Sequence, residues 1–275
     1  MNHIPVRFIE DLLNRIEVLH DLTLHQELSG NFGLCAEKVT NNSHISWLTV
    51  KDGAFEYRAD DCNGKIPKFR TLKCFEYQTS TDSAPQIDPK LPAIIQQYLK
   101  EPGMLSLDLW SSTFDDKWIQ LFLSWESLNL VDLSCAFTGP VYQLLEHLLH
   151  KEQLVKLVVL QDDYGTRGIG LFCRFLEQKQ FMNLMLNCYG EDMKDRILAE
   201  NDKSKFVGST IFWLNYFKIH DESFEALERT DMSTLRFRKG NMLVTYSHSN
   251  VTRYMATQEF FRKWPSTDLR FLNEA

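Results

Sequence analysis

Apolar residues in the second half of the chain recur in one spacing: an apolar residue, two others, an apolar residue, one other, and an apolar residue. The triplets are Met104-Leu107-Leu109, Leu128-Val131-Leu133, Leu154-Leu157-Val159, Phe181-Leu184-Leu186, Ile211-Leu214-Tyr216 and Met232-Leu235-Phe237. Their first residues are 24, 26, 27, 30 and 21 positions apart. The last two apolar positions alternate with other residues, as in a short strand that buries one face. The pattern therefore predicts a series of short strands.

The segments between these strands have helical periodicity. Apolar residues three and four positions apart mark helices in 115–125, 140–148 and 169–176,. Pro140 suits a first helical turn, and Asp221 is a candidate N-cap for a further helix that carries Phe224 and Leu227,. A single strand and helix cannot bury its apolar face alone, so neighbouring units are expected to stack.

This unit resembles the leucine-rich repeat, which runs L-x-x-L-x-L and then turns into a helix. The resemblance covers about residues 104–240 and implies an irregular α/β solenoid with a parallel sheet. The family usually has Asn or Cys at the next consensus position, whereas this chain has Ser112, Ala136, Asp162, Tyr189, Ile219 and Gly240. A generic α/β fold with parallel strands is the alternative. An aromatic helix at 258–264 is expected to close the stack.

Residues 41–103 are predicted to connect this domain (104–275) to an N-terminal segment (1–40). Ile45-Leu48-Val50 and Phe69-Leu72-Cys74 fit the same triplet spacing. However, no helix fits between them, and Lys51-Asp52-Gly53 has the composition of a hairpin turn, so an antiparallel flap is the alternative,. A proline-rich loop at 77–92 precedes a helical pattern from Leu91 to Leu99,.

The N-terminal segment has an apolar helical face followed by a second short helical pattern that starts near Asp21,. Ile4-Pro5, Phe8-Ile9, Leu12-Leu13, Asp21-Leu22, Leu28-Ser29 and Phe32 follow the spacing of an F-box. This resemblance implies docking on the Skp1 subunit of a cullin-RING ubiquitin ligase. The residues expected to contact Skp1 are Ile4, Pro5, Phe8, Ile9, Leu12, Leu13, Leu22 and Leu28.

Two features depart from the F-box pattern: the proline between the first two helices is missing, and one residue is inserted near Val18-Leu19. The order of the two motifs resembles that of F-box/leucine-rich-repeat adaptors, and the whole chain is similar to the expanded F-box-like families of nematodes, many of which have degenerate motifs. Alternatively, residues 4–36 only cap the open end of the repeat stack, because solenoids require such caps.

Composition narrows the classes of function. The 275 residues are 44% hydrophobic, which is typical of a folded protein,. Their net charge of −7 disfavours general nucleic-acid binding,. No apolar run reaches the roughly 18 residues of a membrane helix. The six cysteines lack paired spacing, so reduced thiols in a cytoplasmic protein are expected, with a nuclear location also possible,.

Candidate chemistry is sparse. His147 and His150 lie three residues apart but lack the H-E-x-x-H order of a zinc site,. The glycine-rich stretch 165–170 lacks the Gly-Lys-Ser/Thr ending of a phosphate loop and is interpreted as a strand-to-helix connection,. Asp60-Asp61-Cys62-Asn63-Gly64 lacks the final Glu of a calcium loop,. We therefore expect no catalytic site, cofactor or metal.

Three functions follow in order of preference. The first is a non-catalytic substrate adaptor that docks on Skp1 and binds a target protein with its repeats. The second is a leucine-rich-repeat binding module with no ubiquitin-ligase link. The third is a phosphate-handling α/β enzyme around residues 165–170.

Overall fold

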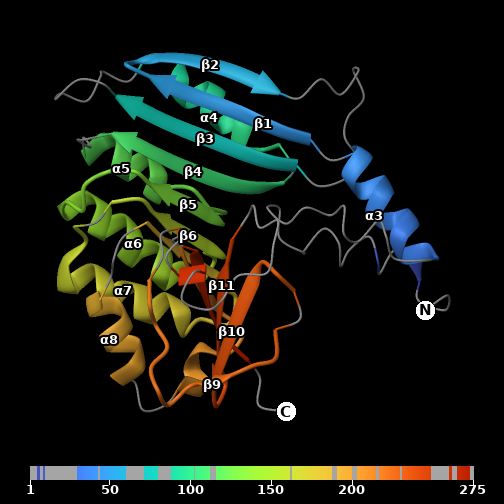
Figure 1. The fold of residues 1–275 in the computed structure, drawn as a ribbon. Coiled ribbons are helices and arrows are strands. Elements are labelled where there is room, and N and C mark those ends of the chain that lie inside the picture. The colour runs from blue at the N-terminus through green and yellow to red at the C-terminus, as the bar shows by residue number, and fades with distance from the viewer. Residues whose placement is uncertain are drawn as a thin grey trace. The chain divides into compact units, whose positions relative to one another are not determined.

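The computed structural model shows a mixed α/β protein (Figure 1). It describes residues 5–6, 9, 30–42, 44–59, 71–79, 88–101, 103–111, 116–161, 163–187, 191–199, 203–214, 217–229, 231–248, 260–261 and 265–272. The helices are α3 (Asn31–Asn42), α4 (Leu91–Leu99), α5 (Asp116–Leu123), α6 (Gly139–Lys151), α7 (Gly165–Leu176) and α8 (Glu191–Ala199), with a short 3-10 helix η1 (Lys203–Phe206). No helix in these ranges is long and apolar enough to cross a membrane.

Twelve strands lie in the hydrogen-bonded order β2-β1-β3-β4-β5-β6-β7-β8-β12-β11-β10-β9. Their bounds are β1 His44–Lys51, β2 Ala54–Ala59, β3 Thr71–Thr79, β4 Met104–Ser111, β5 Leu130–Leu133, β6 Lys156–Val159, β7 Asn183–Leu186, β8 Thr210–Trp213, β9 Glu225–Ala226, β10 Thr234–Lys239, β11 Met242–Ser247 and β12 Ser266–Phe271. The chain divides into two compact units, and the boundary between Asp108 and Leu109 falls inside β4. The three-segment division made from the sequence stays a prediction.

In the first unit, β1 and β2 form an antiparallel hairpin around Asp52-Gly53. Both turn residues have positive φ, 48° and 86°, which a type I′ hairpin turn requires and which an Asp-Gly pair tolerates,. The hairpin prediction is confirmed. The antiparallel flap is wrong for the next strand, because β1 and β3 pair in parallel with Leu48 opposite Phe75. The true equivalents of Ile45-Leu48-Val50 are thus Leu72-Phe75-Tyr77, which begin three residues later than the expected triplet Phe69-Leu72-Cys74.

Helix α4 begins at Leu91, as predicted, and buries Leu91, Ile95 and Tyr98 on one side. The single phenol proton of Tyr98 is shared between the carbonyl oxygens of Ser46 (2.8 Å) and Cys74 (2.9 Å),. These bonds join the last turn of the helix to β1 and β3. The predicted loop at 77–92 is wrong at its start, because β3 continues to Thr79.

In the second unit, strands β5 to β8 are parallel. The last two apolar positions of the first four predicted triplets lie on β4, β5, β6 and β7, which are neighbours in the strand order. Matching backbone bonds link the ladder: Ser134 N–H donates to Leu109 O, Leu160 to Leu133, Asn187 to Val159 and Leu214 to Leu186. The second and third apolar positions of these triplets are almost wholly buried. Helices α5 to α8 lie along one side of these strands (Figure 1).

The fifth triplet is predicted in the wrong register. Ile211 lies opposite Leu184, and Trp213 lies opposite Leu186, so the true triplet is Gly208-Ile211-Trp213. Gly208 has a φ of 90° and donates its N–H to Phe271 O, an arrangement that favours glycine over an apolar side chain,. The spacing from β7 to β8 is therefore 27 residues rather than 30.

The sixth triplet is not a repeat. Leu235 and Phe237 lie on β10, which pairs antiparallel with β11, and Met232 before it is exposed. The parallel series ends at β8, because β12 pairs with it in the antiparallel direction. The two-residue Gly240-Asn241 turn joins β10 to β11.

Helices α5, α6 and α7 confirm three of the predicted helical segments. The helix predicted from Asp221 is wrong: Asp221 Oδ1 accepts the Ser223 N–H at 2.8 Å in a turn, and the short strand β9 follows. Helix α8 was not expected, because its few large apolar residues, Met193, Ile197 and Leu198, lie among many charged residues. Of the expected aromatic helix at 258–264, Phe260 and Phe261 are helical and the rest lies outside the described residues.

Candidate binding surface

The N-terminal residues expected to contact Skp1 are largely outside the described part of the chain. Ile4, Phe8, Leu12, Leu13, Leu22 and Leu28 all fall there. Pro5 is exposed, and its carbonyl accepts the Ile9 N–H at 3.2 Å, as in a helical turn. The Ile9 side chain is only 1% exposed. Docking by this segment thus stays a prediction, and Ile9 as it lies here presents no surface to a partner.

A continuous row of side chains crosses the second unit on the sheet face opposite the helices. It consists of the register partners Asp132, Val158, Met185, Phe212, Asp268, Thr245 and Arg236, on β5, β6, β7, β8, β12, β11 and β10. All seven are partly exposed, whereas their neighbours along β5 to β8 are buried under the helices. At about 4.8 Å per strand, the row spans roughly 29 Å.

The chemistry of this row changes along its length. Its middle is apolar, with Val158, Met185 and Phe212 side by side and the exposed Leu214 one position beyond Trp213. Burial raises the pKa of Asp268 above its usual range, and the Arg270 guanidinium, which lies 3.0 Å from its carboxylate, opposes that effect. An apolar centre with charged groups at its margins is the usual anatomy of a protein-binding patch.

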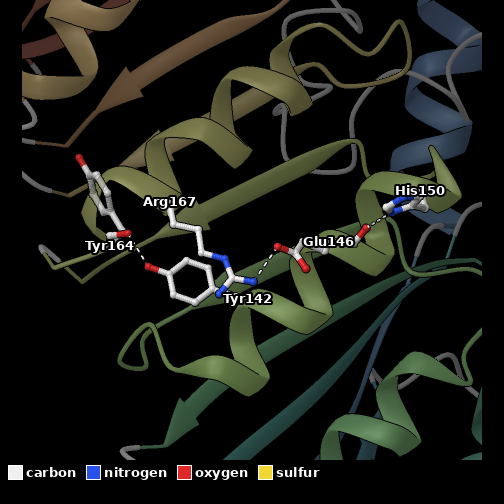
Figure 2. Close-up of polar contacts among 5 residues, drawn as sticks. All are labelled: Tyr142, Glu146, His150, Tyr164 and Arg167. Carbon is white, nitrogen blue, oxygen red and sulfur yellow. Dashed lines mark hydrogen bonds and ion pairs between the residues drawn. The ribbon is translucent and has the colours of Figure 1, made fainter.

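The glycine-rich stretch 165–170 is not a loop, because α7 begins at Gly165. Figure 2 shows the polar contacts of Arg167 in this stretch. Arg167 is held by two partners on α6: its guanidinium lies 2.8 Å from Glu146 Oε1 and 4.4 Å from the centre of the Tyr142 ring. The Tyr142 phenol donates to Tyr164 O at 2.7 Å. These contacts join two neighbouring helices. They also engage the guanidinium of Arg167, which is the cation of this stretch that a phosphate-binding site would use.

Other candidate groups serve local structure. His150 Nδ1 lies 2.6 Å from Glu146 O in its own helix, so this nitrogen already has a partner within α6. Within the described residues, no three His, Cys, Asp or Glu side chains are placed to hold a metal ion. Cys35, Cys74, Cys135 and Cys173 are buried, and burial raises the pKa of Cys74 and Cys135 to about 12. The stretch 60–64 lies outside the described residues.

Sequence reasoning missed the row as a surface, although part of it was readable. Asp132, Val158 and Met185 are the residues between the two last apolar positions of their triplets, where side chains must point away from the core,. Phe212 was missed because of the register error at β8. Arg236 holds the same position in the sixth predicted triplet, although its strand β10 is antiparallel and not a repeat. Asp268 and Thr245 carry no repeat signal, since only the antiparallel strands bring them into line.

Three comparisons with known proteins add no relative. The chain matches no protein family model, and no curated protein or solved structure shows significant similarity to it.

Proposed function

We propose that this chain is a non-catalytic adaptor whose second unit binds a target protein. The observation that carries the proposal is the seven-strand row from Asp132 to Arg236, which lies on the sheet face that α5 to α8 leave uncovered. Its partly exposed apolar centre provides anchors, and its charged margins select the partner. The repeated strand–helix units hold these side chains on a rigid support.

The proposal includes docking of the N-terminal segment on a Skp1-like subunit. Its support is the F-box spacing that starts at Ile4-Pro5 and the exposure of Pro5. The mechanism is proximity: the adaptor holds its target near a ubiquitin-loaded enzyme and makes no bond itself. A few apolar anchors on an amphipathic helix supply most of the energy of such contacts.

A binding module without a ligase link is the second candidate. The burial of Ile9 favours it, because a residue that packs inside its own chain is not available to Skp1. In this case, the N-terminal segment completes the fold, and the sheet row is the surface proposed to bind a target protein.

Affinity purification with mass spectrometry tests the target-binding surface. Met185→Glu places a charge in the apolar centre, and Arg174→Glu changes an exposed residue of α7 on the helical side as a matched control. We expect specific partners to be recovered with the wild type and with Arg174→Glu and to be lost with Met185→Glu. Equal recovery by all three forms would contradict the proposal.

A pull-down with purified Skp1 separates the two candidates. The wild type is compared with a double variant, Pro5→Ala and Leu12→Asp. Recovery that the double variant abolishes supports the ligase link. Absence of Skp1 from both samples supports the module without that link.

A further inference from the structure

Strand β2 is an unusually exposed edge of the first unit. It stands at the end of the strand order and pairs with β1 (Figure 1). All five residues from Ala54 to Arg58 are exposed, including Phe55 (39%) and Tyr57 (50%). Edge strands with exposed aromatic residues are common sites for the addition of another strand.

The hairpin register determines which backbone groups face outward. Lys51 and Ala54 flank the two-residue turn and form its hydrogen-bonded pair,. Bonding toward β1 then alternates along β2, so Ala54, Glu56 and Arg58 direct their N–H and C=O groups toward β1,. The backbone groups of Phe55, Tyr57 and Ala59 therefore point to the outer edge, where an added strand would bind.

The charged residues of β2 are complementary to a second copy of the same strand. Glu56 and Arg58 lie on one face, with Glu56 Oε1 3.4 Å from Arg58 Nε and both side chains more than 60% exposed. In an antiparallel pair with a two-fold axis at Tyr57, Glu56 of each copy lies opposite Arg58 of the other. These are positions without hydrogen bonds, where opposing side chains are closest.

The neighbouring register is disfavoured. An axis at Glu56 would place the two Glu56 carboxylates directly opposite each other, and like charges in that position destabilise a pair. The axis at Tyr57 also gives hydrogen-bonded pairs at Tyr57–Tyr57 and at Phe55–Ala59, so every outward group of the three residues has a partner.

We propose that β2 pairs antiparallel with β2 of a second copy of this chain, about a two-fold axis at Tyr57. The interface is isologous, because each copy contributes the same six residues, Ala54–Ala59,. It is separate from the sheet row proposed for target binding, so the dimer would carry two target-binding rows, one on each copy.

Sedimentation velocity over a concentration series tests the proposal on the full chain. We expect a monomer–dimer equilibrium for the wild type. Arg58→Glu replaces both opposite-charge pairs by like-charge pairs and should raise the dimer dissociation constant about tenfold or more. The charge-swapped double variant, Glu56→Arg with Arg58→Glu, should return it to within about threefold of the wild type. Lys179→Glu, an exposed change of equal charge in the second unit, is the control and should leave it unchanged.

Two results would overturn the inference. The first is a wild type that is monomeric at every concentration, which would leave this edge to an extended segment of another protein. The second is a charge-swapped double variant whose dimer dissociation constant does not return toward that of the wild type. Circular dichroism of each variant verifies that the fold is intact. Oxidative cross-linking then tests the register. Tyr57→Cys should form a disulfide-linked dimer. Glu56→Cys, which contains the same native cysteines and is therefore the control, should not. The reverse pattern would refute the axis at Tyr57.

Discussion

The ammonium group of Lys73 donates to the main-chain oxygen of Glu101 at 2.7 Å. The same group donates to Leu99 O at 3.0 Å, and the Lys73 side chain is almost wholly buried. Burial lowers the pKa of Lys73, and the charge of Glu101 partly opposes this. The lysine thus satisfies carbonyls at the end of α4 that have no partner within the helix.

Replacement of Lys73 by Met should destabilise the protein by about 1–3 kcal/mol, because two carbonyls would lose their donor in a buried site. The control is Lys100→Met, an exposed change next to the same helix end, which should cost about 0.5 kcal/mol or less,. Urea unfolding measures both. Equal effects would mean that the buried contacts of Lys73 contribute nothing to stability.

The register of β8 is tested by two leucines of the same ladder. Leu186 is fully buried, whereas Leu214, placed in the core by the sequence pattern, is 40% exposed. Leu186→Ala should cost about 2–5 kcal/mol of unfolding free energy. Leu214→Ala should cost about 1 kcal/mol or less. If Leu214→Ala costs as much unfolding free energy as Leu186→Ala, Leu214 lies in the core, as the sequence pattern predicted, and the register described for β8 is wrong.

Asp108 should make stability depend on pH. Burial and the charge of Glu76 raise its pKa to about 6, although a hydrogen bond from Ser106 acts against this. Between the unfolded value of about 3.9 and the folded value, the folded state binds the extra proton, so its contribution to stability is present at low pH and is lost as pH rises. Unfolding free energies from pH 4 to 7 should show this fall in the wild type relative to Asp108→Asn. Glu76→Gln should move this fall in stability to lower pH, because it removes the charge that helps to raise the pKa of Asp108. An unchanged profile in Glu76→Gln would exclude this coupling between Glu76 and Asp108.

His220 should have the opposite effect. Its ring stacks on Phe237 at 3.9 Å, and its Nδ1 lies 2.7 Å from the Tyr246 phenol oxygen. Because that oxygen already accepts the N–H groups of Ile219 and His220, it donates its proton to Nδ1, which suits the neutral ring.

Burial, followed by the charge of Lys218, lowers the pKa of His220, although Asp221 opposes them. The unfolded state therefore binds a proton first, and this contribution to stability is lost as pH falls below about 6.5. His220→Phe removes the titrating group and should flatten the thermal stability profile between pH 5 and 7.5. A profile that remains as steep as that of the wild type would refute this assignment.

Local patterns were sufficient for the repeated part of the second unit. Val131-x-Leu133, Leu157-x-Val159 and Leu184-x-Leu186 repeat a strand that must bury one face, and the helical spacing of α5 to α7 follows from the same requirement,. The Asp52-Gly53 turn was readable for a similar reason, since few residue pairs tolerate its backbone angles,. In these elements, neighbouring residues impose the conformation.

Tertiary structure alone decided the remainder. Gly208 occupies a position where the repeat pattern requires an apolar residue, because its φ of 90° favours glycine,. Its N–H donates to Phe271 O, 63 positions along the chain. Likewise, Asp268 and Arg236 join the row that begins at Asp132 only through the pairing of β8 with β12 and of β10 with β11. Periodicity records which face of an element is buried, but the choice of a strand's neighbour depends on contacts between residues far apart in the sequence, which no local pattern contains.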